Sequence, residues 1–396
     1  MNILIGNTQE FNPQIGGVEM VSSILAKVFT EMGHKVFFVA CLKSPYSKMY
    51  VPAVEQTLLP DKTYDSVINK QKLLSVCADK KIEIILNQAG NIAEFTRLCA
   101  FVSKEQQIPL ISAIHINPLN KISAIKDYKF SAINKFSYLK GFGRMLLMPL
   151  RYRRIYMEEQ ILYGEVCSTS DKVVLLSKGY LKELEYLTGK GYLKNVIAIA
   201  NPVNSKFLNK PIIKEKIVLF VGRLDFDHKR PDRLICIWER MYKNYPDWKL
   251  KFAGDGPFKK QLMDYIVKKG IRNVEFLGFC DTSKQYQNAS ILCLTSTIEG
   301  LPMVLLEGIS YGCIPLSFDS FNSVFDVIEN NKNGFIIQSY HLKKYEIKLR
   351  LLMDNEELRA TMCQESIESS HKFEPHSMAS DWISLFTEAI NTKKHE

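Results

Sequence analysis

Two glutamates, Glu299 and Glu307, lie eight residues apart in the second half of the chain. Gly300 and Pro302 predict a tight turn between them, and the apolar run that follows predicts a helix carrying Glu307 about two turns inside it. Both carboxylates could then accept paired hydrogen bonds from sugar or ribose hydroxyls, while backbone N–H groups after Gly300 suit phosphate oxygens. The alternative is an ordinary capped helix.

A second candidate is the loop after the predicted strand Ile217–Val221, which carries Gly222, Arg223 and, six residues later, Lys229. Two cations in one loop could clamp a diphosphate leaving group and stabilise the charge that develops as its bond breaks. A solvated surface loop is the alternative. The position of this loop at the carboxyl end of the first strand of a second domain favours a site.

A glycine pair, Gly16 and Gly17, separates the first predicted strand from an apolar helix. Glycines at such a turn let backbone N–H groups approach an anion, and the helix N-terminus adds partial positive charge. By itself such a pair is more often a simple turn. The pattern is not G-x-G-x-x-G, and no acidic residue closes the next strand, so NAD and FAD are disfavoured.

These residues require a scaffold, and the chain alternates short β-branched apolar runs with longer helical patterns, which is typical of βαβ units. The predicted strands are Asn2–Ile5, Lys35–Ala40, Ile82–Leu86, Pro109–Ile114, Lys172–Leu176, Val196–Ile199, Ile217–Val221, Lys249–Ala253, Val274–Phe276, Ile291–Leu294, Ile314–Phe318 and Gly334–Ile337. The sequence therefore predicts an α/β protein with two Rossmann-like domains, 1–200 and 201–375. The breaker pair at Asn201 marks the boundary, and 376–396 forms a C-terminal helix that packs back towards the first domain.

Composition bounds the class of protein. The 396 residues suit two domains, and 46% apolar with 24% charged residues is ordinary globular composition. Nine scattered cysteines without a C-x-x-C pair indicate reduced thiols. We find neither a signal peptide nor an apolar run of membrane-spanning length, so the chain is expected to be soluble or peripheral.

Charge is concentrated in the first half, with 25 Lys and Arg against 17 Asp and Glu in 1–200, compared with 27 against 25 in 201–396. The segment 121–165 breaks the βα rhythm and mixes nine cations with Phe, Tyr, Leu and Met. Cations beside large apolar side chains suit an anionic membrane interface. The alternative is a helical hairpin packed on its own domain with solvated Lys and Arg.

Five motifs in this order resemble the retaining glycosyltransferases of family 4. They are Gly16-Gly17-Val18-Glu19, Val221-Gly222-Arg223-Leu224 with Lys229, Ala253-Gly254-Asp255-Gly256-Pro257, Leu277-Gly278-Phe279 and Glu299-Gly300-Leu301-Pro302-Met303-Val304-Leu305-Leu306-Glu307. The resemblance covers nearly the whole chain. It implies the GT-B fold, two Rossmann-like domains facing each other across a cleft, with the donor held mainly by the second domain and the acceptor by the first.

The resemblance also implies roles for individual residues. Arg223 and Lys229 look like the diphosphate clamp, closed by amides of Gly16 and Gly17. Glu299 resembles the contact to donor-sugar hydroxyls and Glu307 the contact to ribose. The remaining donor-binding positions that match the family are Gly278 and Phe279 at the nucleobase and Gly300, Leu301, Pro302, Met303 and Val304 at the turn and helix start.

His115 matches the family's histidine near the donor sugar and its anomeric carbon, although a core histidine is a fair alternative there. Asp225-Phe226-Asp227 spells D-x-D, a metal signature of the other nucleotide-sugar fold. It lies inside the Arg223–Lys229 loop, where the family uses no metal. We therefore expect no metal and no cofactor, and a cationic clamp in their place.

The resemblance implies a retaining transferase that moves a hexose or N-acetylhexosamine from a nucleotide-sugar, with UDP the common nucleotide. The basic segment adds the hypothesis of a membrane lipid-linked glycan acceptor in surface polysaccharide synthesis. The expected location is the cytoplasm, on the inner face of the membrane. The rivals are an epimerase or phosphorylase on the same fold, and a non-catalytic membrane-surface or nucleic-acid binding module driven by the basic half, which the less basic, clamp-bearing half disfavours.

Overall fold

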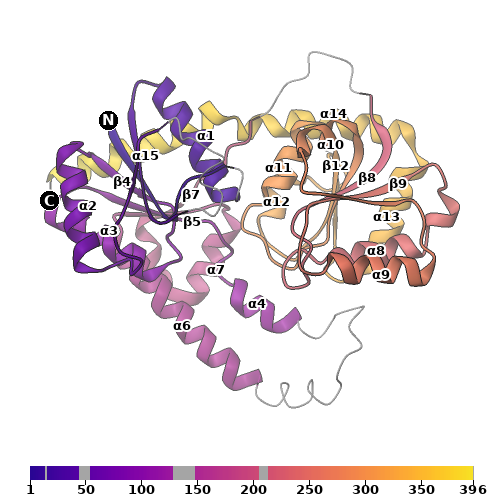
Figure 1. Ribbon diagram of the computed structural model, residues 1–396, viewed down its shortest axis with the longest axis horizontal. Helices are drawn as coiled ribbons and strands as arrows, with labels where there is room; N and C mark the ends of the chain where they lie inside the picture. The colour runs from indigo at the N-terminus through magenta and orange to yellow at the C-terminus, as the bar shows by residue number, and fades with distance from the viewer. Residues whose placement is uncertain (14–15, 44–53, 128–147, 205–212, 396) are drawn as a thin grey trace. The chain divides into compact units, whose positions relative to one another are not determined.

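The computed structural model describes residues 1–13, 16–43, 54–127, 148–204 and 213–395. The chain divides into two compact units. Unit 1 comprises Met1–Leu119, Arg154–Val203 and Phe373–Glu396, and unit 2 comprises Asn120–Arg153 and Asn204–Lys372. Each unit is built on one parallel sheet (Figure 1).

The sheet of unit 1 has the order β3-β2-β1-β4-β5-β6-β7. Its strands are β1 Asn2–Gln9, β2 Lys35–Leu42, β3 Gln56–Leu58, β4 Ile84–Asn87, β5 Leu110–Ile114, β6 Lys172–Leu175 and β7 Val196–Ala198. All neighbouring strands are parallel. The order reverses between β1 and β4, so the carboxyl ends of these two strands form a topological switch point.

Helices connect these strands, as parallel pairing requires. They are α1 Gly17–Glu31, α2 Val67–Asp79, α3 Ala93–Gln106, α6 Met148–Thr169 and α7 Gly179–Thr188, with a 3-10 turn at Lys190–Asn195. A core cluster buries Leu4 and Ile85 of the sheet against Phe95 and Leu98 of α3. This packing fixes where the strands end, and hence where the loops carrying functional side chains begin.

The sheet of unit 2 has the order β10-β9-β8-β11-β12-β13 and is also parallel. Its strands are β8 Glu215–Val221, β9 Lys249–Ala253, β10 Val274–Gly278, β11 Ala289–Leu294, β12 Ile314–Phe318 and β13 Phe335–Ile337. The helices are α8 Pro231–Glu239, α9 Lys259–Lys269, α10 Thr282–Asn288, α11 Met303–Ser310, α12 Val324–Val327, α13 Leu342–Asp354 and α14 Glu356–Ser370, with 3-10 turns at Tyr242–Asn244 and His371–Phe373. The order reverses between β8 and β11, which makes a second switch point there.

The last helix, α15 Pro375–His395, belongs to unit 1 although it follows unit 2 in the sequence. It lies beside α1, where Phe386 packs edge-on against Phe29 with ring centroids 5.6 Å apart (Figure 1). Lys393 forms an ion pair with Asp171 at 2.7 Å, which ties the helix to the start of β6. A continuous helix over these residues extends the predicted amphipathic stretch by one residue at its start and five at its end.

All twelve predicted strands occur, with small differences at their ends. The prediction missed β3, a three-residue edge strand whose side chains are only half-buried. A strand this short has too little alternation to be recognised in a sequence. The division between the sheets falls after Val203, three residues beyond the predicted boundary at 200/201. All nine cysteines are free thiols.

The basic segment 121–165 contains α4, Asn120–Asp127, and most of α6. Residues 128–147, which include four of the nine cations, lie outside the described part of the chain, and so does the side chain of Lys126 in α4. The division of the chain into units crosses this segment inside α6, whereas the sequence prediction kept 121–165 in the first domain. Within the described residues, no helix is both long and apolar enough to span a membrane.

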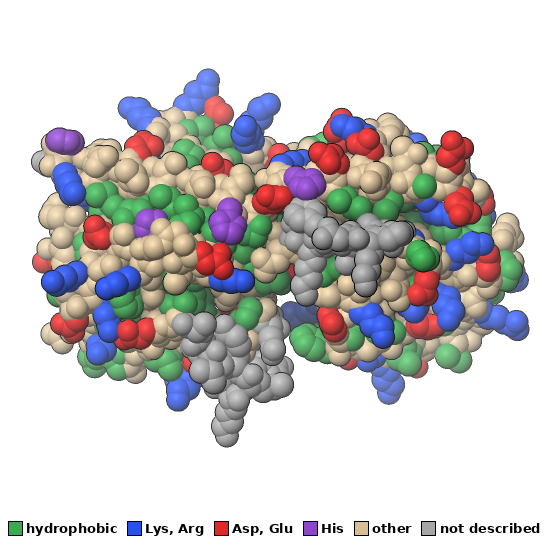
Figure 2. Space-filling model, turned by 90° about the horizontal axis from the view of Figure 1, so that it is seen from above, with side chains coloured by type: hydrophobic (Ala, Val, Ile, Leu, Met, Phe, Trp, Pro, Cys, Tyr) green, Lys and Arg blue, Asp and Glu red, His purple; other side chains and the backbone are tan. Residues whose placement is uncertain are grey.

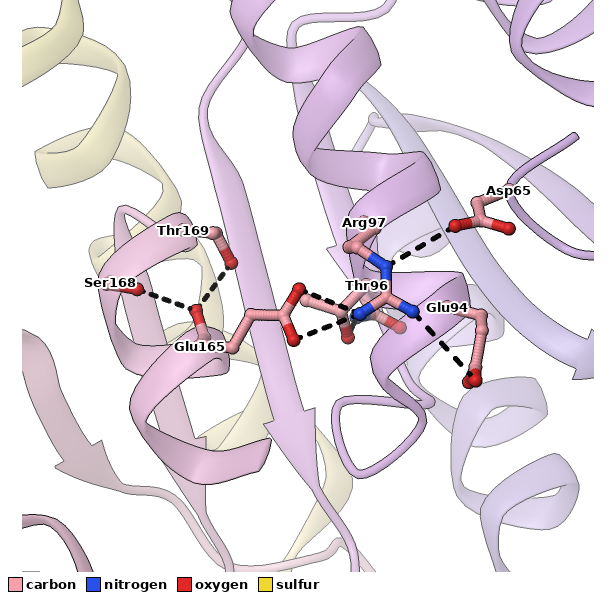
Figure 3. Close-up of polar contacts among 8 residues, drawn as sticks. Asp65, Glu94, Thr96, Arg97, Glu165, Ser168 and Thr169 are labelled. Carbon is pink, nitrogen blue, oxygen red and sulfur yellow. Dashed lines mark hydrogen bonds and ion pairs between the residues drawn. The ribbon is translucent and has the colours of Figure 1, made fainter. Parts of the chain in front are cut away.

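A charged network fastens the second half of α6 to unit 1. Arg97 of α3 donates from Nη1 to both carboxylate oxygens of Glu165, each at 3.0 Å, and from Nε to Asp65 at 3.3 Å (Figure 3). Glu94 lies 3.9 Å from the same guanidinium. The forked arrangement joins α3, α6 and the loop before α2 through one side chain.

Candidate functional site

The carboxyl edge of the second sheet brings together two loops far apart in sequence. Residues 222–230 follow β8, and residues 295–302 follow β11, the two strands that flank the switch point. The amide N–H of Thr297 donates to the carbonyl of His228 at 2.7 Å, and Thr295 Oγ1 donates to the carbonyl of Arg230 at 2.8 Å. These bonds hold the two loops in fixed register.

Lys229 and Glu299 meet at this edge. Lys229 Nζ lies 2.7 Å from Glu299 Oε1, and the two side chains are 19% and 10% exposed. Such a pair is largely withdrawn from water, so each charge needs the other or a replacement partner. The cation and the carboxylate, which were predicted separately from the sequence, therefore form one ion pair.

The loop carrying Lys229 is held in shape by Asp225. One oxygen of this buried carboxylate accepts hydrogen bonds from the amides of His228 and Lys229, at 2.8 and 3.0 Å. The Arg223 side chain is 71% exposed, with Nε 3.8 Å from the other Asp225 oxygen. Asp225, the first aspartate of the D-x-D sequence, thus stabilises the loop by accepting two backbone hydrogen bonds. No cluster of three metal-ligating side chains occurs among the described residues.

Three glycines allow the loops to approach closely. Gly222 and Gly254 have φ of +142° and +138°, values that L side chains rarely adopt. A Cβ on Gly254 would lie 2.1 Å from the carbonyl oxygen of Gly222, and one on Gly256 would lie 2.5 Å from that of Leu224. The Lys229 stem passes beside Gly222, where Cε would lie 3.3 Å from an added Cβ. Side chains at these positions would displace the loop that carries Lys229.

Helix α11 begins immediately after the loop of Glu299, with Pro302 as its N-cap and no side-chain cap hydrogen bond. The N-terminus of this helix therefore adds positive electrostatic potential close to Glu299, the ion-pair partner of Lys229. Glu307 lies four residues after Met303, just over one turn into α11 rather than the predicted two, beside the buried Tyr286. Burial raises the pKa of the Glu307 carboxyl, while Tyr286 and the charge of Lys229 lower it.

Gly278 ends β10 at the same edge, and Phe279 follows it. Gly278 has φ of +66°, and its carbonyl accepts a hydrogen bond from the amide of Gly254 at 2.8 Å. The ring of Phe279 is 84% exposed. This backbone is therefore joined to the glycine-rich loops, while the neighbouring aromatic ring is open to solvent.

The first sheet carries a different set of groups at its carboxyl edge. Gly16 precedes α1, and the carboxylate of Glu19 folds back to within 2.5 Å of where a Gly16 Cβ would stand. Asn7, at the end of β1, donates to Glu19 Oε1 at 3.1 Å. Burial raises the pKa of the Glu19 carboxyl. A carboxyl at the N-terminus of α1 reduces the positive potential that Gly17 and the first turn would otherwise offer an anion.

His115 follows β5 and contacts Gln88, which follows β4. Its Nε2 lies 2.5 Å from Gln88 Oε1. Burial lowers the pKa of His115 to about 4, so the imidazole is neutral at physiological pH. The histidine is therefore fixed by a polar partner, unlike a core histidine surrounded only by apolar side chains.

The structure gathers the predicted residues in two groups. Unit 2 holds Arg223, Lys229, Gly278, Phe279, Glu299, Gly300, Leu301, Pro302, Met303, Val304 and Glu307, while unit 1 holds Gly16, Gly17 and His115. Sequence reasoning missed Gln88, Asp225 as a staple, and Tyr286. For Gln88 the only signal was a polar pair directly after a buried strand; Tyr286 carried none.

Comparison with protein families matches residues 204–369 to the family described as Glycosyl transferases group 1. The match spans the whole of the second sheet and the loops that hold Lys229 and Glu299.

Two curated relatives align over about half of the chain. An uncharacterised glycosyltransferase of Haemophilus influenzae is 32% identical over 218 residues, which are 54% of this chain and 61% of the relative. The second, from Campylobacter jejuni, is named GalNAc-alpha-(1->4)-GalNAc-alpha-(1->3)-diNAcBac-PP-undecaprenol alpha-1,4-N-acetyl-D-galactosaminyltransferase. It is 29% identical over 205 residues, 50% of this chain and 56% of the relative. The matched part thus spans less than two thirds of either relative.

Among solved structures, Anabaena Alr3699/HepE in complex with UDP superimposes with a TM-score of 0.74 at 15% identity, covering 98% of this chain and 100% of the other. At this identity the likeness concerns the fold. The fold is the GT-B fold, with two Rossmann-like units, as the sequence predicted.

Proposed function

Because residues 204–369 belong to the glycosyl transferases group 1 family, we propose that this chain is a retaining glycosyltransferase that carries a hexose or N-acetylhexosamine from a nucleotide-sugar, with UDP as nucleotide, to a lipid-linked glycan. The observation that carries the proposal is the ion pair of Lys229 with Glu299 at the switch point of the second sheet. The pair places a cation for a diphosphate beside a carboxylate for sugar hydroxyls.

When the donor binds, Lys229 and Glu299 separate and each takes a part of the donor as its new partner. The diphosphate takes the place of Glu299 as the partner of Lys229, with Arg223 and the N-terminus of α11 as further sources of positive charge. Glu299 is then free to accept hydrogen bonds from hydroxyls of the donor sugar. The low exposure of both side chains supports this exchange, because neither charge would be left unpaired in a largely buried site.

The nucleoside half of the donor lies along the same edge. Glu307 binds the ribose hydroxyls, and the backbone at Gly278 and Phe279 faces the base. The position of Gly278 against Gly254 supports this placement, because it joins the end of β10 to the loop that follows β9. UDP is the nucleotide named in the structure of Alr3699/HepE.

Transfer requires no metal ion in this proposal. Charge on the departing diphosphate is stabilised by Lys229 and Arg223, and the leaving phosphate itself takes the proton of the acceptor hydroxyl on the same face of the sugar. Asp225 supports this view, because one of its oxygens is occupied by two backbone amides of the loop. Front-face transfer preserves the anomeric configuration of the sugar.

The acceptor is a membrane lipid-linked glycan of surface polysaccharide assembly, and the protein works at the cytoplasmic face of the membrane. The name of the Campylobacter jejuni relative includes an undecaprenol-linked glycan. In this chain, Leu150, Met157 and Ile161 are 68%, 50% and 67% exposed. Their spacing places them on one face of α6. The exposed Arg151, Arg153 and Arg154 lie on the same helix.

The face drawn in Figure 2 carries mixed charge. Lys and Arg side chains of the described residues lie among Asp and Glu on this face. The described side chains of this face therefore do not form a uniformly basic surface that would attract an anionic membrane.

A donor screen tests the function. Purified protein is incubated with UDP-, GDP- and ADP-sugars, with and without a polyprenyl-diphosphate-linked sugar, and nucleotide release is measured. We expect release from UDP-sugars that rises with the lipid acceptor and continues in EDTA. NMR of the product should show the anomeric configuration of the donor. Release from no donor would exclude the proposal, and an inverted product would exclude retention.

Vesicle flotation tests the membrane contact. The wild type and a Leu150→Ser, Ile161→Ser double variant are compared on vesicles with and without anionic lipid at low salt. We expect the wild type to float with anionic vesicles and the variant to float several-fold less. Equal behaviour of the two proteins would remove α6 from the membrane contact.

A further inference from the structure

One buried amide at the edge of the first sheet has unused donors. Gln88 is 2% exposed, and its Nε2 lacks a hydrogen-bond partner among the described residues. Leaving such a donor unsatisfied in the interior is destabilising, because its hydrogen bonds to water are lost and not replaced. An apolar side chain of similar size would avoid that cost. The presence of an amide therefore indicates a ligand that accepts a hydrogen bond from Gln88 Nε2.

The other end of this amide determines the protonation of His115. Gln88 Oε1 can only accept a hydrogen bond, and it lies 2.5 Å from His115 Nε2. The proton of the neutral imidazole is therefore on Nε2. His115 Nδ1 is left unprotonated, as a hydrogen-bond acceptor.

The backbone holds both residues rigidly. The amide of Gln88 donates to the carbonyl of Gly6 at 2.8 Å, which ties it to β1 across the switch point. The amide of Gly90 donates to the carbonyl of Ala113 in β5 at 3.1 Å. A Cβ on Gly90 would lie 2.6 Å from that same oxygen, so the two loops approach as closely as glycine permits.

We propose that Gln88 is a positioning and specificity residue of the transfer reaction. Its Oε1 fixes His115 in the Nε2–H tautomer, and its unused Nε2 donates to an oxygen of the sugar substrate. The sugar then meets a donor on Gln88 and an acceptor on His115, which together read a hydroxyl group in both of its hydrogen-bonding roles. This inference rests on the proposed glycosyltransferase function.

Nitrogen NMR of the imidazole rings tests the first half of the proposal. The signal of His115 is identified by its loss in a His115→Asn variant. At pH 7.5 we expect the Nε2–H tautomer in the wild type and in Gln88→Glu, whose carboxylate still accepts a hydrogen bond from Nε2–H. Gln88→Met should lose this preference. An Nδ1–H tautomer in the wild type, or an unchanged tautomer in Gln88→Met, would overturn the assignment.

Kinetics test the second half. Nucleotide release is measured with UDP-glucose, UDP-galactose, UDP-N-acetylglucosamine and UDP-N-acetylgalactosamine, and then with 3-, 4- and 6-deoxy forms of the accepted donor. Both Gln88→Met and Gln88→Glu should lower kcat/KM about 10–100-fold, because each removes the Nε2 donor. One deoxy donor should lower wild-type activity similarly yet change the Gln88→Met variant little.

Ser103→Ala is the matched control. Ser103 is also buried in unit 1 and donates to the carbonyl of Ile108 at 2.6 Å, near the opposite end of β5. Its loss should reduce stability without changing the preference among deoxy donors. Wild-type kcat and KM in Gln88→Met, or equal penalties for every deoxy donor in both proteins, would overturn the inference alone. An inactive wild type would instead overturn the proposed function as well.

Discussion

The two sheets present different chemistry at edges of the same topological kind. At the switch point of the second sheet, Lys229 and Glu299 form an ion pair on glycine-lined loops. At the first sheet the side chains are amides and an imidazole, Asn7, Gln88 and His115, beside a carboxyl whose pKa is raised by burial. Charged groups suit a diphosphate, whereas neutral donors and acceptors suit sugar hydroxyls. We therefore expect the same architecture to support two kinds of recognition.

The largest effect is expected when a charge is removed from the carboxyl edge of the second sheet, which we call the charged edge. Lys229→Ala removes the cation that stabilises the departing diphosphate, and kcat/KM for nucleotide release should fall about 10³-fold. Lys216→Ala is the control, because Lys216 forms an ion pair with Asp247 near the amino end of β8, the strand that precedes the Lys229 loop. Steady-state kinetics of both variants check this. Similar activity in the two variants would contradict the clamp assignment.

Glu299→Gln sharpens the same comparison. This change removes the carboxylate that holds Lys229 in the absence of donor, so the affinity for UDP alone should be retained or improved. Release of UDP from the UDP-sugar should nevertheless fall about 10²-fold, because the contact to sugar hydroxyls is weakened. Calorimetry with UDP and kinetics with the UDP-sugar separate these effects. Loss of UDP affinity would argue against the partner exchange.

The backbone of the charged edge should be intolerant of side chains. Gly254→Ala places a Cβ 2.1 Å from the Gly222 carbonyl at φ of +138°, and we expect a loss of about 3 kcal/mol in the free energy of unfolding. Gly270→Ala is the control, since Gly270 also has positive φ but meets nothing within 4 Å. It should cost about 1 kcal/mol. Urea unfolding measures both, and equal losses would show that crowding is unimportant.

The carboxyl edge of the first sheet, which we call the neutral edge, should make the free energy of unfolding depend on pH. The pKa of His115 is about 4 in the folded protein against 6.5 as its ordinary value, so the unfolded chain takes up the proton first as pH falls. Stability is complete above pH 6.5 and is lost progressively towards pH 4, by about 2 kcal/mol between pH 7 and 5. Urea unfolding at both pH values should show this loss in the wild type and a smaller one in His115→Gln. Identical losses would show that His115 titrates normally.

The smallest effect is expected away from both edges. Arg97 is 43% exposed, and its ion pairs with Glu165 and Asp65 lie at the surface. Arg97→Ala should lower the free energy of unfolding by less than about 1 kcal/mol and leave nucleotide release unchanged. A double-mutant cycle with Glu165→Ala measures the coupling. A large loss of activity would mean that the anchoring of α6 matters for the site.

Two Rossmann-like sheets and most elements could be predicted from the sequence, because strand patterning and breaker residues act locally, whereas the GT-B fold was implied by the resemblance of the motifs to a known family. Twelve strands were found from β-branched apolar runs, while β3 was too short to show a pattern. Motifs place Arg223, Lys229 and Glu299 in loops after buried strands and Glu307 in the helix that follows. These residues were found for that reason, and their roles remain predictions. Gln88 was missed, since a pair of amide side chains after a strand carries no spacing signal of its own.

By itself the sequence determined which segments become strands, where glycines permit close turns, and which loops carry charge. These properties depend on a residue and its near neighbours. Only the tertiary structure decided that Lys229 meets Glu299 across 70 residues, that Gln88 meets His115 across 27, and that α15 returns to unit 1. The physical reason is that strand order brings together the ends of strands distant in the chain, and burial there then sets pairing and protonation.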